Sequence, residues 1–129
     1  MNLSDTQINA LKNALSKPIS SRINSPVQIG EMIQEANKSM TLSSISQIMG
    51  LKDKSFIKRF ITILELPEDI KSRIQWKGVP GSISFTTAYI IAIDIPEEKQ
   101  RVIEYLRTEE GKLISKNDLL KLVIDSRLS

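Results

Sequence analysis

Residues that commonly cap the N-terminus of an α-helix recur along this chain, each just before a segment with helical periodicity. The segments are short, and glycine or proline follows several of them. Such closely spaced helix boundaries predict an all-α fold, a multi-helix orthogonal bundle that contains a helix-turn-helix. The predicted helix starts are Ser4 or Asp5, Ser25 with Pro26, Thr41, Asp53, Glu68 with Asp69, Ser84, Pro96 and Ser115.

Apolar residues recur three and four positions apart in these segments, as they do on the buried face of an amphipathic helix. The broadest stripe consists of Ile57, Phe60, Ile61 and Leu64. Trp76 is expected to fill the core rather than to offer a stacking surface. The other expected core residues are Ile8, Leu11, Leu15, Val27, Ile29, Ile33, Ala36, Ile45, Ile48, Met49, Ile70, Ile74, Ala88, Ile91, Ala92, Val102, Ile103, Leu106, Leu119, Leu120, Val123 and Ile124.

Two details of this helical pattern are less constrained. The segment Ile90–Ile95 is rich in β-branched residues, which also favour a strand. The flanking sequences TTAY and PEEKQR fit a helix, a loop and a second helix better, so we predict helix and keep strand as the alternative. Gly111 is expected to end the seventh helix, which begins at Pro96.

The composition excludes most catalytic chemistry. The chain contains no histidine and no cysteine, which removes the commonest general base, the thiol nucleophile and the usual metal ligands. We therefore expect no enzyme activity, no metal and no cofactor. Glu97, Glu98, Glu109 and Glu110 are expected to be solvated residues at helix ends rather than metal ligands.

The chain shows no signal for a membrane or for secretion. Its longest apolar run, Tyr89 to Ile93, is too short to span a bilayer, and the N-terminus lacks a basic region followed by an apolar block. The expectation is a cytoplasmic, nucleoid-associated protein without membrane partners.

Positive charge is concentrated in one short stretch. The net charge of the chain is +3, and residues 52–60 hold four basic residues and one acid. The sequence before this stretch has four basic and three acidic residues, and the sequence after it has ten basic and eleven acidic ones. A local basic patch suits an anionic partner, and nucleic acid is the commonest one.

The same stretch lies in a predicted helix-turn-helix. A short helix, Leu42–Met49, is followed by the turn Gly50–Asp53 and by a second helix, Lys54–Leu64. If the second helix is a recognition helix, its outward residues reach base edges in the major groove of double-stranded DNA, and Lys52 in the turn contacts phosphate. The alternatives are a solvated helix face or a surface for protein contacts. The outward residues are Lys54, Ser55, Lys58, Arg59 and Thr62.

From Met40 onward the sequence resembles the central DNA-binding domain of the ParB family of plasmid and chromosome partition proteins. The segment MTLSSISQIMG resembles the family pattern L-T-x-x-x-I-A-x-x-x-G, and FIKRFITILELPEDI resembles its recognition helix followed by L-x-L-P-x-x-[VI]. The segments WKGVPGSISFTTAYIIA and LISKNDLLKLV resemble two later family helices. The resemblance predicts a ParB-like domain at residues 25–129. The N-terminal helix and connector at residues 1–24, which the helical pattern predicts, have no obvious counterpart in the family.

This resemblance implies a function in DNA partition or transcriptional regulation. It also implies a palindromic site, a possible partition ATPase as partner, and a phosphate contact by Lys77, which could equally be a solvated lysine. A homodimer is expected because small helix-turn-helix proteins commonly engage two half-sites at once. The sequence contains neither the nucleotide-binding domain nor the dimerisation domain of the family, so no CTP binding is expected. The alternative function is a helical protein–protein interaction module, a partner adaptor that keeps the fold without binding DNA.

The register of the predicted recognition helix is open at one position. The turn holds one residue more than the usual family spacing. Counting from Gly50 puts Phe56 in the first buried slot, whereas counting back from Pro67 puts Ile57 there. The outward residues stay outward in both registers.

Overall fold

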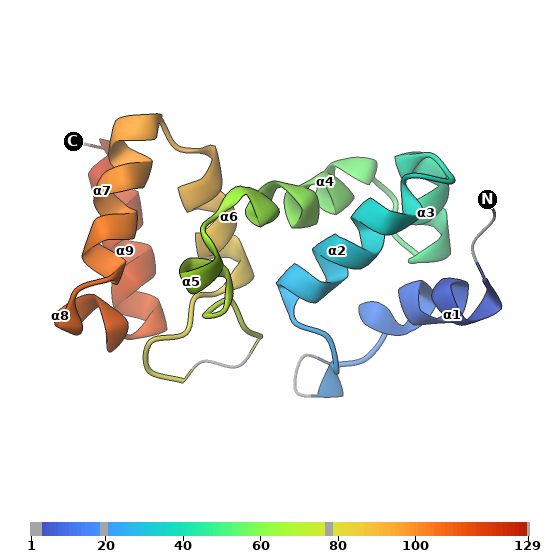
Figure 1. Cartoon of the computed structure of the whole chain (residues 1–129), viewed down its shortest axis with the longest axis horizontal. Helices are drawn as coiled ribbons and strands as arrows, with labels where there is room; N and C mark the ends of the chain where they lie inside the picture. Colours follow the sequence, from blue (N-terminus) through green and yellow to red (C-terminus); the bar gives the residue numbers. More distant parts are fainter. Residues whose placement is uncertain (1–3, 19–20, 77–78, 129) are drawn as a thin grey trace. The chain divides into compact units, whose positions relative to one another are not determined.

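Helices make up nearly all the regular structure of this protein, as the closely spaced caps predict. The computed structural model describes residues 4–18, 21–76 and 79–128. Its helices are α1 (Asp5–Ala14), α2 (Pro26–Ala36), α3 (Leu42–Ile48), α4 (Lys54–Thr62), the 3₁₀ helix η2 (Ile63–Glu65), α5 (Glu68–Lys71), α6 (Phe85–Ile93), α7 (Pro96–Leu106), α8 (Glu109–Lys112) and α9 (Lys116–Leu128) (Figure 1). The all-α, multi-helix prediction is confirmed.

The helix starts follow local hydrogen bonding. Ser25 caps α2 with a reciprocal pair, because its hydroxyl accepts from the Gln28 N–H at 3.2 Å and the Gln28 side chain accepts from the Ser25 N–H at 2.9 Å. Side chains of the same kind cap five more of the predicted starts, whereas α5 and α7 begin without a side-chain cap. The five capping residues are Ser4, Thr41, Asp53, Ser84 and Ser115.

Two compact units divide the chain, Met1–Leu64 and Glu65–Ser129, which we call the first and the second unit. The helix α1 belongs to the first unit, where it contacts α2 and α3. The sequence predicts a domain boundary after residue 24, whereas the boundary between the two compact units follows Leu64. The predicted boundary stays a prediction.

In the first unit, α2 lies along α4 (Figure 1). Gly30 permits this approach, because a Cβ added there would overlap the carbonyl oxygen of Phe60 on α4. Ile29, Ile33 and Ile57 are completely buried around this contact. Several residues predicted for the core are only half-buried, because they lie at the edges of their helix stripes. These are Ile8, Leu15, Val27, Ile48, Ile61 and Leu64.

In the second unit, α6 and α7 both contact α9, and α8 follows directly on α7. The only β pairing among the described residues is a single bridge between Ile74 and Ile83. The strand alternative for Ile90–Ile95 is wrong, since α6 continues to Ile93. Burial explains the choice: Ile91 and Ala92 both lie in the core, which a strand with alternating faces would not allow.

Three further predictions for the second unit need correction. The helix α7 ends at Leu106, and Gly111 lies inside the short helix α8, where a side chain would overlap the Tyr105 carbonyl. Trp76 is half-buried, with its ring centroid 6.0 Å from that of Phe85. Ile124 is 41% exposed and Leu120 is half-buried, since the buried face of α9 is centred on Leu119 and Val123.

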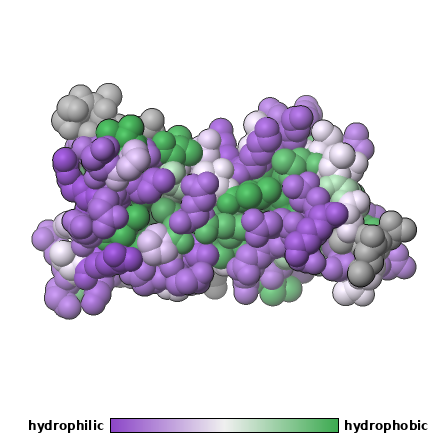
Figure 2. Space-filling view, turned by 45° about the horizontal axis from the view of Figure 1, so that its top comes forward, coloured by the Kyte–Doolittle hydropathy of each residue, from purple (hydrophilic) through white to green (hydrophobic). Residues whose placement is uncertain are grey.

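Hydrophilic residues cover much of the face drawn in Figure 2, with apolar residues exposed between them. Among the described residues, no helix is both long and apolar enough to cross a membrane.

Candidate nucleic-acid interface

The connection from α3 to α4 is held in one conformation by local hydrogen bonds. Gly50 adopts a φ of 74°, in the left-handed region that glycine enters without strain. Its N–H donates to the Gln47 carbonyl at 3.1 Å, and the Leu51 N–H donates to the Ser46 carbonyl at 2.9 Å. These two bonds close the C-terminal end of α3 around the glycine. The buried Ser46 hydroxyl adds a third bond by donating to the Leu51 carbonyl at 3.1 Å.

At the other end of this turn, Asp53 fixes the start of α4. Its carboxylate accepts a hydrogen bond from the Ser55 N–H at 2.9 Å. This satisfies one of the free N–H groups of the first turn of α4. The two helices are therefore joined by a turn with hydrogen bonds on both sides, and α4 is presented in a defined direction within the first unit.

The buried face of α4 settles its register. Ile57 and Phe60 are completely buried. Phe56 is half-buried, and the centroid of its ring lies 5.5 Å from that of Phe60 in an edge-to-face contact. Ile57 therefore takes the first buried slot, as counted back from Pro67.

The opposite face of α4 is polar and exposed. Lys54, Ser55, Lys58 and Arg59 are all exposed, as the sequence predicts. Thr62 is half-buried, and its hydroxyl donates to the Lys58 carbonyl at 2.8 Å. Thr62 therefore keeps only acceptor capacity for a further partner.

Three lysines of this surface form no ion pair with a described carboxylate, although Asp53 is close enough to Lys54 and Lys58 to interact with their charge. Within the described ranges, no carboxylate forms an ion pair with Lys52, Lys54 or Lys58, although ion pairs occur elsewhere on the molecule. The one acid beside them, Asp53, is occupied as the helix cap. The exposed face therefore offers positive charge to an anion in solvent.

A hollow of about 360 Å³ lies between α3 and the start of α4. Ser43 and Gln47 line it from α3, and Lys52, Asp53 and Lys54 line it from the turn and α4. Sequence reasoning missed Ser43 and Gln47. Their spacing of four residues on the exposed face of the first helix is the signal that could have found them.

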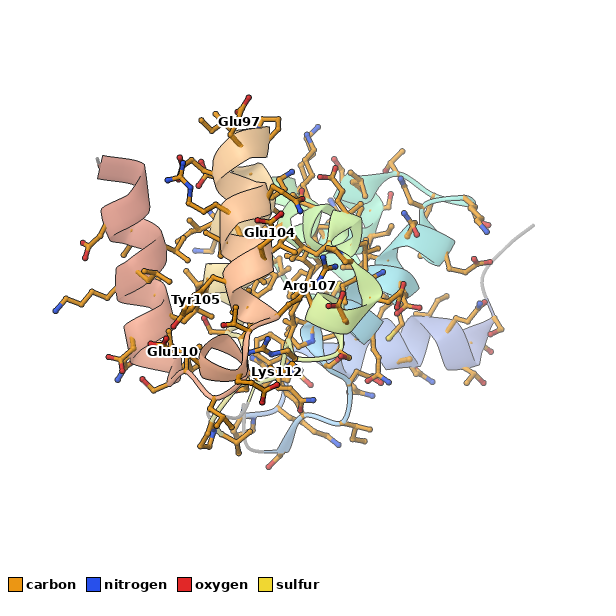
Figure 3. The ribbon with its side chains drawn as sticks, turned by 60° about the vertical axis from the view of Figure 1, so that its left-hand side comes forward. Glu97, Glu104, Tyr105, Arg107, Glu110 and Lys112 are labelled. Atoms are coloured by element: carbon orange, nitrogen blue, oxygen red, sulfur yellow. The ribbon has the colours of Figure 1, made fainter. Side chains whose placement is uncertain are left out.

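The remaining candidate residues are Lys77 and four glutamates, all of which come after α4 in the sequence. Lys77 lies outside the described residues. Glu97 lies at the start of α7, whereas Glu110 lies in α8 beyond the other end of α7 (Figure 3). No group of acids that could hold a metal ion is present in the described part of the chain.

Comparison of the chain with models of protein families, with curated proteins and with solved structures found no match. The resemblance to the ParB family therefore depends on the short motifs alone and stays a prediction.

The cap of α4 should make stability depend on acid. The hydrogen bonds from Ser55 hold the pKa of the Asp53 carboxyl below its usual value, and Lys54 and Lys58 lower it further. A carboxyl with a lowered pKa in the folded state stabilises the protein at pH values above its unfolded pKa, about 3.9 for aspartate. This stabilisation is lost as the pH falls through the folded pKa.

We therefore expect the pH dependence of stability to change in Asp53→Asn, which keeps an acceptor oxygen but cannot ionise. The difference in Tm between the wild type and the variant should be constant from about pH 7 to pH 5 and should shrink below about pH 4. Thermal unfolding followed by circular dichroism measures it. A difference in Tm that stays constant down to about pH 2 would contradict the role of ionised Asp53 as the cap.

Proposed function

We propose that this protein binds double-stranded DNA, with α4 as a recognition helix in the major groove. The observation that carries the proposal is the division of α4 into two faces. Ile57 and Phe60 anchor one face in the core, while Lys54, Lys58 and Arg59 project from the other. The fixed turn before α4 supports the proposal, because a recognition helix must be held in a defined direction by its scaffold.

The residue types on this surface suit both kinds of DNA contact. Lysine and arginine donate to O6 and N7 of guanine, and serine can contact several bases, so Lys54, Ser55, Lys58 and Arg59 are the proposed base readers. Lys52, in the hollow between α3 and α4, is the proposed phosphate contact. Gln47 and Ser43 can donate to the same phosphate.

The resemblance to the ParB family supports a role in DNA partition or transcriptional regulation. In either role a homodimer would engage two half-sites one helical turn apart, and a partition ATPase is a candidate partner in the first role. Selection of bound duplexes from a random pool is the experiment that addresses this part, because a palindromic consensus sequence indicates two protein chains per site.

The double variant Lys58→Ala/Arg59→Ala tests the assignment of α4. Both side chains are exposed, so folding should be intact. Removal of two charged groups that touch DNA should raise the Kd for the selected duplex by about 30-fold. The slope of log K against log salt concentration should flatten by about one unit for each phosphate that the variant no longer neutralises. Gel shifts or fluorescence anisotropy across a salt series measure both effects.

The matched control is Lys12→Ala/Lys17→Ala, which removes the same charge from exposed positions of the first unit outside the α3–α4 region. Its Kd should stay within about threefold of the wild type. Equal affinity of the wild type and Lys58→Ala/Arg59→Ala would disprove the role of α4. Absence of binding to any duplex at low salt would instead favour the protein-interaction module.

A further inference from the structure

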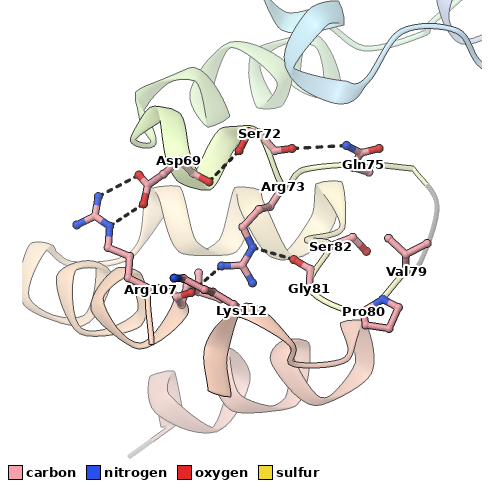
Figure 4. Close-up of a pocket in the computed structure, with 11 residues that line it drawn as sticks. Asp69, Ser72, Arg73, Gln75, Val79, Pro80, Gly81, Ser82, Arg107 and Lys112 are labelled. Carbon is pink, nitrogen blue, oxygen red and sulfur yellow. Dashed lines mark hydrogen bonds and ion pairs between the residues drawn. The ribbon is translucent and has the colours of Figure 1, made fainter. Parts of the chain in front are cut away.

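The second unit contains a cavity that the proposed DNA surface does not use. Its volume is about 510 Å³, within the usual range for small-molecule sites. Figure 4 shows the Arg73 guanidinium between the Asp69–Arg107 pair on one side and the Gly81 segment on the other. The cavity is lined by polar and apolar residues. The main polar ones are Asp69, Arg73, Ser82, Arg107 and Lys112, and the apolar ones are Val79, Pro80 and Leu106.

The walls of this cavity are held by hydrogen bonds to Arg73. Its Nε donates to the Gly81 carbonyl at 2.8 Å, Nη1 donates to the Leu106 carbonyl at 2.7 Å, and Nη2 donates to the Gly111 carbonyl at 2.6 Å. One guanidinium therefore joins the segment before α6 to the end of α7 and to α8. An arginine has more N–H groups than these three bonds use, so donors remain for a ligand.

The segment around Gly81, residues 79–82, is also held by the backbone N–H of Gly81. The Gly81 N–H donates to the Ile114 carbonyl at 3.0 Å. Gly81 has a φ of 85°, and a side chain there would overlap the Lys112 carbonyl. Because both sides of the segment are held in this way, the cavity is formed before any ligand arrives.

Positive charge exceeds negative charge on the cavity lining. Burial lowers the pKa of Arg73, and Asp69 raises it to a smaller extent. The carboxylate of Asp69 is bound to another residue: its oxygens accept from Arg107 at 2.8 Å and 3.1 Å. No ion pair to Arg73 occurs among the residues that the structure describes. Lys112 adds a further charge, and its one ion pair among the described residues is with the exposed Glu109, at 3.6 Å.

One neutral donor of the lining is also without a partner. Ser82 is 4% exposed, and its hydroxyl forms no hydrogen bond to the described residues. A buried hydroxyl without a partner is unfavourable, and such groups are rare in folded proteins. The oxygen has almost no accessible surface, so the cations of the lining, rather than this hydroxyl, would hold a ligand.

We propose that this cavity binds a phosphate group, with Arg73 and Lys112 as its cationic ligands. Phosphate fits better than carboxylate, because its several oxygens can accept from donors on three sides. The charge of a phosphate monoester, nearly two, also matches the excess of cations, whereas a backbone diester carries one negative charge. The phosphate is carried either by a small phosphate monoester, with its organic part against Val79 and Pro80, or by a nucleic-acid backbone. This site does not depend on DNA binding by α4.

Titration of the ¹⁵N-labelled full chain with phenyl phosphate tests the proposal by NMR. The expected result is a saturable shift of the Arg73 Nε–H signal and of the Gly81 and Ser82 amide signals. In Lys112→Gln the Kd should rise at least about fivefold, because the phosphate then has one cationic ligand fewer. The Kd for phenyl phosphate should not change in Lys121→Gln, which removes an exposed lysine outside the cavity.

Two further titrations separate the sources of phosphate, and both use the Lys58→Ala/Arg59→Ala variant so that α4 does not contribute. Saturation by phenyl phosphate but not by a short duplex identifies a small ester. Saturation by the duplex alone identifies a backbone phosphate. If neither probe gives a saturable shift, or if sodium chloride at equal ionic strength gives the same shift, the cavity is not a phosphate site.

Discussion

Gly30→Ala is expected to destabilise the first unit by about 3 kcal/mol and to lower its Tm by about 15 °C. The added methyl group would overlap the carbonyl oxygen of Phe60, which is backbone and cannot move aside as a side chain does. The second-nearest contact is also backbone, and the Leu64 side chain is close on the same side. Relief therefore requires α2 and α4 to move apart, which opens the core around Ile33 and Ile57.

This variant also connects the fold to the proposed function, because α4 carries the DNA surface. A shift of α4 on its scaffold should weaken DNA binding although Gly30 is buried and touches no partner. Thermal unfolding and anisotropy with the selected duplex measure the two effects on the same sample, the second of them below the lowered Tm.

Gly50→Ala is the matched control for the change from glycine to alanine. An added Cβ there has no atom within 4 Å, so only the strain of a φ of 74° remains. That strain costs about 1 kcal/mol, and the loss of stability should be correspondingly smaller. If Gly30→Ala is no more destabilising than Gly50→Ala, the result contradicts our inference that α2 packs too closely on α4 to admit a side chain at residue 30.

Local signals account for the parts of the fold that the sequence predicted well. A cap such as Ser25 or Asp53 bonds to N–H groups two or three residues away, so the cap can be inferred from its neighbours alone. The positive φ of Gly50 is local in the same way, because it follows from the end of one helix and the start of the next.

Positions that depend on distant partners were not predictable in this way. The sequence left Phe56 and Ile57 as equal candidates for one buried slot, and packing against other helices decided for Ile57. Ile124 is apolar and lies beside Val123 in α9, but only Val123 is buried, because the neighbouring helices cover a narrower face than the apolar residues span. Gly111 looks like a helix end, whereas its role is a close approach to Tyr105.

The cavity of the second unit also could not be predicted from the sequence. Arg73 contacts carbonyls that lie 8, 33 and 38 residues away in the sequence. No spacing rule predicts which backbone groups a single arginine will join over such distances. The basic residues of α4 could be assigned to one face, because the helix period alone brings them together.

Arg73→Met is expected to destabilise the second unit by about 3 kcal/mol. Methionine retains part of the apolar stem but has no N–H groups, so the carbonyls of Gly81, Leu106 and Gly111 lose their donor. All three residues are buried, and a buried acceptor without a partner costs about 1 to 3 kcal/mol. Water that enters the cavity can bond to some of these carbonyls, which keeps the total well below the sum of three such penalties.

Urea unfolding of the wild type and of the variants measures the effect. Arg101→Met removes an exposed arginine of the same unit whose guanidinium is 3.2 Å from Glu98, and surface ion pairs of this kind contribute less than about 1 kcal/mol. Arg73→Lys should lie between the wild type and Arg73→Met, because one ammonium group can donate to a carbonyl but cannot span all three. If Arg73→Met loses no more stability than Arg101→Met, Arg73 does not hold the cavity walls together.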